Sequence, residues 1–250
     1  LAIANQDAAE SGDLCLRCHF ARGWLAGRSV PTDGSRMTAA DGDGVSCALC
    51  HRLVDPVYQA GQSPTNDLAI LAALSFPGTN YGNGMFVIDS TGTRRGPFTN
   101  AAAPHTFLAS PFHSSSAFCG TCHDVSNPAF QSDGAGNYNA NAFDTTATNF
   151  SPHFMAPVER TYSEWLHSDY NTPSGVYAPQ FAGNKPDGRV ATCQDCHMRD
   201  VSGYGCNPTN SPPLRADLPL HDLTGGSTWL PGLLTNLYPG EVNVAAIQAG

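Results

Sequence analysis

The sequence contains one short motif four times: two cysteines separated by two residues, with a histidine directly after the second cysteine. The copies are Cys15-Leu-Arg-Cys18-His19, Cys47-Ala-Leu-Cys50-His51, Cys119-Gly-Thr-Cys122-His123 and Cys193-Gln-Asp-Cys196-His197. Cysteine pairs at this spacing can build zinc sites with four thiolate ligands, or they can act as redox dithiols. Neither use requires a histidine at the next position. The fourfold repeat therefore favours a chemistry that uses all three residues.

The pattern C-x-x-C-H is the attachment signature of c-type haem. The two thiols add to the two vinyl groups of one porphyrin, and the adjacent histidine is carried beneath the ring to bind the iron. We therefore expect four covalently attached haem c groups, with His19, His51, His123 and His197 as proximal iron ligands. Because this attachment takes place on the oxidising side of a membrane, the pattern predicts a periplasmic or extracellular protein.

Five histidines outside the motifs are candidates for the second axial position: His105, His113, His153, His167 and His221. An iron held by one histidine either takes a second protein ligand, as in electron carriers, or keeps a position open for substrate. Five candidates for four positions favour bis-histidine ligation of all four irons. His105, His113 and His221 rank first because they lie in loop segments next to motifs. His153 ranks next, and His167 last because it lies in a predicted helix and could face water.

His113 precedes the third motif by only a few residues. The porphyrin anchored at Cys119 and Cys122 would stand between His113 and the far side of its own iron. His113 is therefore predicted to bind a different haem.

The other sulfur-containing side chains have simpler interpretations. Cys206 has no second cysteine outside the motifs to pair with. A buried or loop thiol is favoured, with an intermolecular bridge or an extra haem contact as alternatives. The four methionines are interpreted as packing residues, because enough histidines are present to serve as ligands.

Composition indicates a loop-rich chain. The apolar fraction of 41% is slightly low for a self-sufficient globule, and there are 25 glycines and 19 prolines. We expect a mostly irregular fold with short α-helices and at most a small β-hairpin, in which the haems form the core. Helices are predicted around each motif, over 66–74, near 241–249 and over 159–170, where Thr161 and Glu164 fit a capping box. The hairpin is predicted over 84–98.

A single tetrahaem domain is expected over residues 1–250, with a haem pair around 15–51, a third haem around 105–130 and a fourth around 190–225. A compact chain of this length has a radius of gyration of about 18 Å, so four porphyrins would be near neighbours. The formal charge of −9, with no basic cluster longer than Arg94-Arg95, argues against nucleic acid as a partner. No apolar run approaches the roughly 18 residues that a membrane span needs.

Four stretches resemble successive blocks of secreted multihaem c-type cytochromes: SPFHSSSAFCGTCHDVSNP, VERTYSEWL, ATCQDCHM and LPLHDLTGGSTWL. The resemblance covers roughly residues 44–234. It implies iron-ligand roles for the four motif histidines, and distal roles for His221 and for the histidines before the third motif. Related chains often place a ligand histidine where this chain has Tyr170, and His167 lies a turn earlier.

The chain is also similar, in haem number and size, to tetrahaem extracellular cytochromes that polymerise into conductive filaments. That similarity implies identical subunits as partners, with a histidine donated to a haem of the neighbour. The leading hypothesis is an electron carrier, not an enzyme, that passes electrons to redox partner proteins or to the next subunit. The alternative is a multihaem oxidoreductase with one open haem that acts on a small nitrogen or sulfur compound.

Overall fold

The computed structural model describes residues 11–76, 78–223, 225, 229–237 and 239–240. It divides into two compact units, Leu1–His167 and Ser168–Gly250. The first three motifs belong to the first unit and the fourth motif to the second. The prediction of a single tetrahaem domain stays a prediction, and the helix predicted near 241–249 lies outside the described residues.

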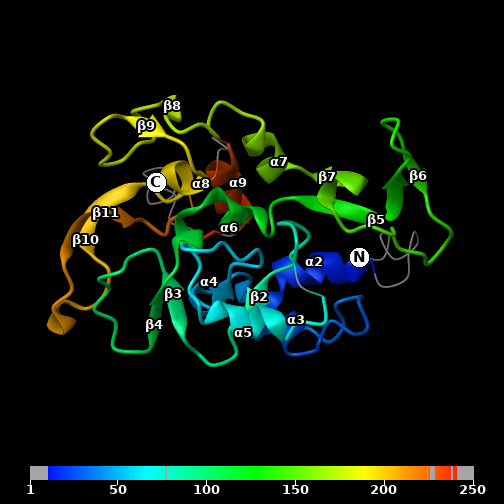
Figure 1. Ribbon diagram of the computed structural model, residues 1–250, viewed down its shortest axis with the longest axis horizontal. Helices are drawn as coiled ribbons and strands as arrows, with labels where there is room; N and C mark the ends of the chain where they lie inside the picture. The colour runs from blue at the N-terminus through cyan, green and yellow to red at the C-terminus, as the bar shows by residue number, and fades with distance from the viewer. Residues whose placement is uncertain (1–10, 77, 224, 226–228, 238, 241–250) are drawn as a thin grey trace. The chain divides into compact units, whose positions relative to one another are not determined.

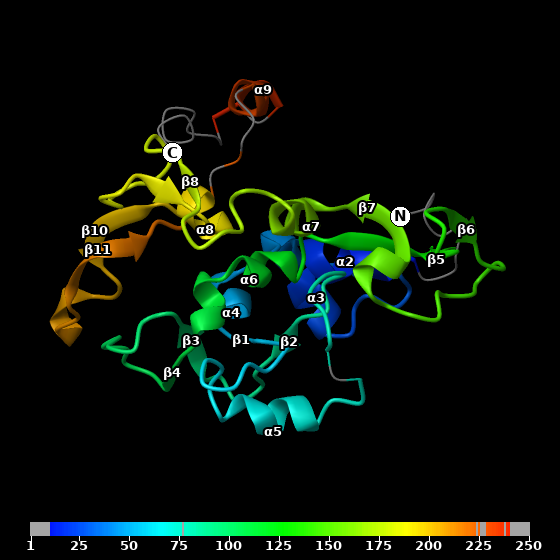
Figure 2. The same cartoon turned by 45° about the horizontal axis from the view of Figure 1, so that its top comes forward.

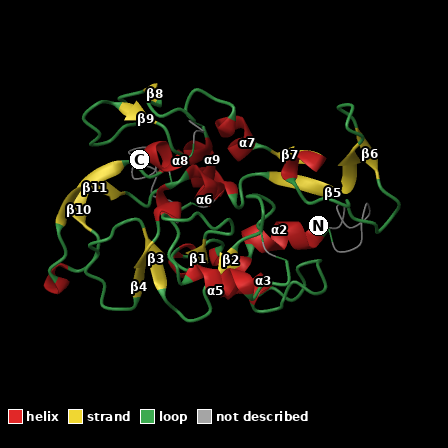
Figure 3. Cartoon of the chain, viewed as in Figure 1, coloured by secondary structure: helices red, strands yellow, loops and turns green. Residues whose placement is uncertain are grey.

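The helices of the first unit are short, and loops join them (Figures 1 and 3). They are α2 (Gly12–His19), α3 (Ala21–Leu25), α4 (Cys47–Cys50), α5 (Asp67–Ala72), α6 (Ser116–Gly120) and α7 (Thr161–Leu166), with 3-10 turns η1 (Ala39–Asp43), η2 (Pro111–Ser114) and η3 (Pro152–Phe154). Helix α5 confirms the helix predicted over 66–74. Helix α7 also forms, but it is shorter than the predicted helix over 159–170: it ends at Leu166, so His167 lies just beyond it, and the predicted capping box is wrong. The N–H of Thr161 instead donates to Glu159 Oε1 at 2.7 Å.

Strands of the first unit form three small sheets. Antiparallel pairing joins β1 (Leu53–Val54) to β2 (Val87–Ile88), parallel pairing joins β3 (Arg94–Gly96) to β4 (Phe107–Ala109), and a three-stranded antiparallel sheet has the order β6 (Tyr138–Ala140), β5 (Val125–Ser132), β7 (Met155–Glu159). The predicted hairpin over 84–98 is wrong, because its two segments, β2 and β3, pair with other strands. The expectation of at most one small hairpin is also wrong, since long-range partners supply hydrogen bonds that local sequence does not reveal.

The second unit contains the fourth motif and two antiparallel strand pairs. Its elements are β8 (Val176–Tyr177), β9 (Arg189–Val190), α8 (Cys193–His197), β10 (Asp200–Tyr204), η4 (Pro208–Asn210), β11 (Leu214–Pro219) and α9 (Leu230–Leu237). Strands β10 and β11 lie side by side in both views of the ribbon (Figures 1 and 2). Their ladder returns the chain toward the fourth motif.

Apolar cores are small in the part of the chain that the structure describes. In the first unit, Val54, Leu71 and Val87 form a buried cluster, and in the second unit Ala178, Ala182 and Val190 form another, with Cys196 packed against it. Among the described residues, buried polar and charged side chains outnumber buried apolar ones. No described helix has both the length and the apolar character that crossing a bilayer would require.

Candidate functional site

Each motif places its two cysteines on one turn of helical backbone. Cys15 and Cys18 lie in α2, Cys47 and Cys50 bound α4, Cys193 and Cys196 lie in α8, and Cys119 lies in α6 with Cys122 two residues beyond its end. Residues three apart on a helix lie on the same face. Both thiols of a pair therefore point to one side, with the histidine following at the end of the turn, as two-point attachment to one planar group requires.

Polar side chains cap the N-termini of two of these helices. The N–H of Leu49 donates to Ser46 Oγ at 3.3 Å, and Thr192 and Asp195 form a capping box around α8. Lys185 Nζ lies 2.5 Å from Asp195 Oδ1. Burial raises the pKa of Asp195, but hydrogen bonds from Lys185 and from backbone amides outweigh burial and lower it. A residue between the two cysteines of the fourth motif thus stabilises the motif's own helix.

Thiols from the first and third motifs are in contact. The Cys18 and Cys122 thiols lie close enough to act on each other, and this interaction lowers the pKa of Cys18 and raises that of Cys122. Burial raises the pKa of Cys122 further, and Cys50 of the second motif acts in the same direction. The three motifs of the first unit therefore each bring a cysteine to one region.

A loop at residues 82–84 links the first and third motifs. The N–H of Gly84 donates to Thr121 O at 2.8 Å, and Arg17 Nη1 donates to Asn83 O at 3.3 Å. Gly84 has a φ of 60°, and a Cβ atom at this position would lie 2.8 Å from Cys18 Sγ. Glycine is needed here both for the left-handed backbone and for the close approach to the thiol.

The imidazole of His51 is held by the backbone of Arg95. His51 Nδ1 lies 2.8 Å from Arg95 O, and the N–H of Arg95 donates to His51 O at 2.7 Å. A carbonyl oxygen can only accept, so Nδ1 carries the proton and Nε2 keeps its lone pair. This tautomer is the one that binds a metal through Nε2, and a hydrogen bond at Nδ1 fixes its orientation. The second motif therefore fits an iron-bound haem.

The side chain of Arg95 belongs to a buried ionic cluster that joins distant parts of the chain. Its Nη2 lies 2.6 Å from Asp67 Oδ1, and its Nη1 lies 2.7 Å from Asp89 Oδ2. Burial raises the pKa of Asp67, and Arg95 opposes that shift. Burial acts in the same way on Asp89, but bonds from Thr91 and Arg95 outweigh it and lower the pKa. Sequence patterns do not single out these residues, because their contacts depend on long-range pairing.

His113 lies against the second motif, although it precedes the third in sequence. Its Nε2–H donates to Cys50 O at 3.0 Å. The ring centroids of His51 and His113 are 6.1 Å apart, with their planes at 16°. Burial lowers the pKa of His113 to about 4, so the ring is neutral near pH 7. The fold thus brings together one motif histidine and one non-motif histidine from separate segments.

The remaining histidines of the first unit are exposed: His19, His105, His123, His153 and His167. His105 Nδ1 donates to Thr106 O at 3.2 Å, which leaves Nε2 as the lone-pair nitrogen. Across the described residues, no hydrogen bond or ring contact joins His105, His153 or His167 to a motif histidine. Their assignment to particular irons stays a prediction.

In the second unit, the β10–β11 ladder brings His221 back toward the fourth motif. Strand β10 begins three residues after His197, and β11 ends two residues before His221. The N–H of Leu220 donates to Arg199 O at 3.1 Å, next to the motif. His221 is exposed, and its Nδ1 donates to Pro219 O at 2.9 Å, which leaves Nε2 available. His197 is exposed as well.

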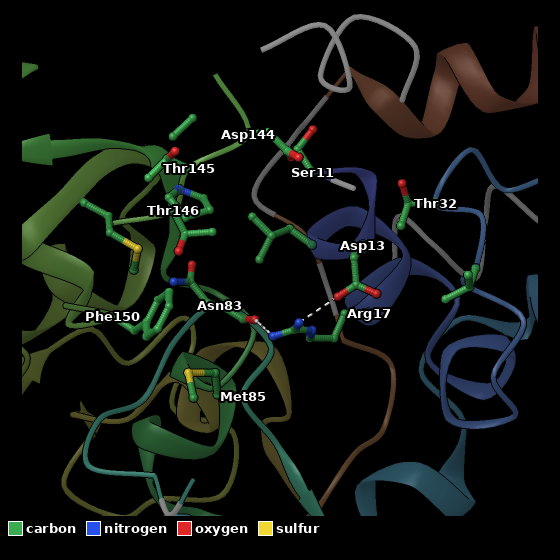
Figure 4. A pocket seen from close by; sticks show the side chains of 15 residues that line it. Ser11, Asp13, Arg17, Thr32, Asn83, Met85, Asp144, Thr145, Thr146 and Phe150 are labelled. Atoms are coloured by element: carbon green, nitrogen blue, oxygen red, sulfur yellow. Dashed lines mark hydrogen bonds and ion pairs between the residues drawn. The ribbon is translucent and has the colours of Figure 1, made fainter. Parts of the chain in front are cut away.

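A cavity of about 600 Å³ lies beside the first motif (Figure 4). Arg17 reaches across it toward Asn83, and its Nη2 is paired with Asp13 Oδ2 at 2.6 Å. Met85 and Phe150 add apolar surface to the lining. None of the 15 lining residues is a cysteine or a histidine, but Arg17, which lies between the two cysteines of the first motif, is one of them.

Two other sequence interpretations concern metal and sulfur. Within the described ranges, no three His, Cys, Asp or Glu residues are grouped so that they could hold a bare metal ion. Cys206 is half-buried in the second unit, with its Sγ 3.9 Å from Asn207 O.

Comparisons with known proteins add no relative. No protein-family model matches the sequence, no curated protein matches it, and no solved structure matches the fold.

Proposed function

We propose that this chain is an electron carrier that binds four haem c groups covalently and acts in the periplasm or extracellular space. One observation carries the proposal: in the second motif a cysteine pair on a single helical turn is followed by an imidazole whose Nδ1–H is bonded to a backbone carbonyl. The other three motifs repeat the same residues on similar turns. Zinc ribbons and redox dithiols need no such histidine.

Haem iron, when bound, supplies reversible one-electron chemistry. The eight motif cysteines hold the four groups, and the motif histidines bind the irons through Nε2. His113 is the distal candidate for the second motif. Two imidazoles that bind one metal from opposite sides have centroids on the order of 6 Å apart, because each metal–nitrogen bond is about 2 Å long. The 6.1 Å separation of His51 and His113 supports this pairing, which requires His113 to give up its bond to Cys50 O.

Transfer of electrons between groups on one chain is supported by the proximity of the first three motifs. The Cys18 and Cys122 thiols, from the first and third motifs, interact with each other. Cys50, from the second motif, is near enough to raise the pKa of Cys122. The scarcity of buried apolar side chains in the described residues supports a core completed by porphyrin. The four porphyrins would supply the apolar surface that the protein's own buried side chains do not.

The acidic chain would favour basic redox partners, and docking would weaken as salt concentration rises. Identical subunits are the other proposed partners, in a filament where one subunit donates a histidine to its neighbour. Every subunit in such a filament gives one histidine and receives one, so all four irons can still have two histidine ligands. Size-exclusion chromatography and negative-stain microscopy of native material distinguish a monomer from a fibre.

The test is production of the chain in a host with periplasmic haem attachment, followed by haem quantification and peptide mass spectrometry. We expect four haems per chain, one on each cysteine pair. A Cys119→Ser, Cys122→Ser chain should carry three, which provides a matched control. Zinc in place of haem, or intact chains with free motif thiols, would contradict the proposal.

Carbon monoxide separates the carrier from the alternative oxidoreductase. A carrier with four bis-histidine irons should bind no carbon monoxide when reduced and should be low-spin when oxidised. In native material, which keeps any neighbouring subunits, stoichiometric binding at one haem would favour an enzyme with an open iron.

A further inference from the structure

We propose that the buried cluster of Arg95, Asp67 and Asp89 sets the reduction potential of the haem held by the second motif, acting through His51. The inference rests on the proposed function, because it concerns one of the four haems. Arg95, Asp67 and Asp89 do not line the cavity beside the first motif. They are positioning residues, and their route to the iron is the imidazole of His51.

His51 makes two hydrogen bonds with the backbone of Arg95. The Arg95 carbonyl accepts from His51 Nδ1 at 2.8 Å, and the Arg95 N–H donates to His51 O at 2.7 Å. One residue therefore fixes both the main chain and the ring of the proximal ligand. A hydrogen bond accepted from Nδ1–H makes Nε2 more basic, which favours the oxidised iron.

The second step is the fixation of Arg95 itself. The side chains of Arg95 and Asp67 are 0% exposed, and that of Asp89 is 4% exposed. Arg95 Nε and Nη2 both donate to Asp67 Oδ1, at 3.2 and 2.6 Å, while Nη1 donates to Asp89 Oδ2 at 2.7 Å. With its guanidinium held from two sides, Arg95 cannot shift its carbonyl without breaking charge-assisted bonds.

The third step is the charge of the cluster. One guanidinium and two carboxylates carry a net charge of −1, and burial makes such charges act strongly over short distances. A negative cluster attached to the proximal ligand stabilises the oxidised iron and lowers the potential. Asp67 anchors this cluster from the first turn of α5, and Arg95 connects it to the second motif.

The decisive variant is Asp67→Asn, which keeps the side-chain shape and an oxygen acceptor for Arg95 but removes one negative charge. The full chain with its haems is titrated by spectroelectrochemistry and followed by electron paramagnetic resonance. A Cys47→Ser, Cys50→Ser chain, which lacks this haem, shows which couple belongs to the second motif. We expect Asp67→Asn to raise the reduction potential of that haem by about 59 mV, which corresponds to a tenfold change in the equilibrium constant of a one-electron couple.

Asp41→Asn is the matched control. Asp41 is also buried and bonded to an arginine, Arg28, and its side chain accepts hydrogen bonds from Arg28 and Thr38. Asp41→Asn should leave the second-motif couple unchanged. Asp89→Asn is the second test variant and should raise it in the same direction as Asp67→Asn.

The outcomes are distinct. An unshifted second-motif couple in both Asp67→Asn and Asp89→Asn, or an equal shift of all four couples, would overturn the inference. If the Cys47→Ser, Cys50→Ser chain does not accumulate, the hyperfine-shifted Nδ1–H signal of His51, assigned by histidine labelling, identifies the same couple. Failure of the proposed function looks different, because the chain would then contain no haem to titrate.

Discussion

The second and third motifs have the same residue pattern, yet the fold holds them in different ways. At the second motif, the ring of His51 is bonded to Arg95 and faces His113. At the third, the main chain is held instead: the N–H of Tyr162 donates to His123 O at 2.8 Å. In the described part of the chain, the exposed ring of His123 makes no hydrogen bond.

The two motifs thus orient their histidine rings differently. The ring of His51 has its tautomer and direction set by protein groups before any cofactor binds. Among the described residues, no hydrogen bond orients the ring of His123, although the neighbouring Asp124 is buried and accepts from Ser163 Oγ at 2.7 Å. We therefore expect polar substitutions to affect the second motif most, and packing substitutions to affect the third.

Arg95→Met should have the largest effect on stability. It leaves Asp67 and Asp89 buried without their cation, and such a loss costs about 3–5 kcal/mol of unfolding free energy. Urea denaturation of the haem-loaded chain measures the change. Haem attachment at the second motif should fall with it, as peptide mass spectrometry would record.

The matching change near the third motif is Arg160→Met. Arg160 is 15% exposed, and its Nη1 lies 3.5 Å from Asp124 Oδ1. Arg160 also donates to Ser126 Oγ and to the backbone carbonyls of Val125, Pro152 and Met155. Because these acceptors are neutral and Asp124 keeps its bond from Ser163, the loss should be smaller, about 1–3 kcal/mol. Equal losses in the two variants would remove the contrast between the motifs.

His113→Met tests which motif His113 serves. A thioether in place of imidazole raises the potential of a haem. The reduction potential of the second-motif haem, the one missing from the Cys47→Ser, Cys50→Ser chain, should rise. The potentials of the other three haems should not change. His105→Met is the control and should leave the second-motif couple unchanged. A change confined to the haem at Cys119 and Cys122 would show that His113 serves its sequence neighbour.

The sequence predicts the local backbone of these motifs better than their surroundings. Local patterns suffice for the four helical turns and for α5, because each depends on neighbouring residues. The clamp on His51 depends on Arg95 in β3, which pairs in parallel with β4 and not with β2 as the predicted hairpin required. The contact between Cys18 and Cys122 likewise joins segments about a hundred residues apart. Long-range pairing of this kind has no signature in residue spacing.

Gly120→Ala should destabilise the third motif through packing. A Cβ atom at Gly120 would overlap the ring of Tyr162, which is buried on α7. Overpacking of this type costs about 1–3 kcal/mol. Gly42→Ala, in η1 before the second motif, is the control: nothing lies within 4 Å of its added Cβ, so the change should stay within about 0.5 kcal/mol. Thermal unfolding of both variants gives the comparison, and equal midpoints would argue against packing as the support of the third motif.

Ser46→Ala should have the smallest effect, and it separates the helix of the second motif from the clamp on its histidine. Ser46 Oγ accepts from the N–H of Leu49, so its loss should cost about 1 kcal/mol, whereas Ser46→Asn keeps an acceptor and should be nearly neutral. The bond from His51 Nδ1 to Arg95 O does not involve this cap. The paramagnetic resonance spectrum of the second haem should therefore stay unchanged in Ser46→Ala although the chain unfolds earlier in urea. If the spectrum changes as much as in Asp67→Asn, the helical turn, and not Arg95, orients the ligand.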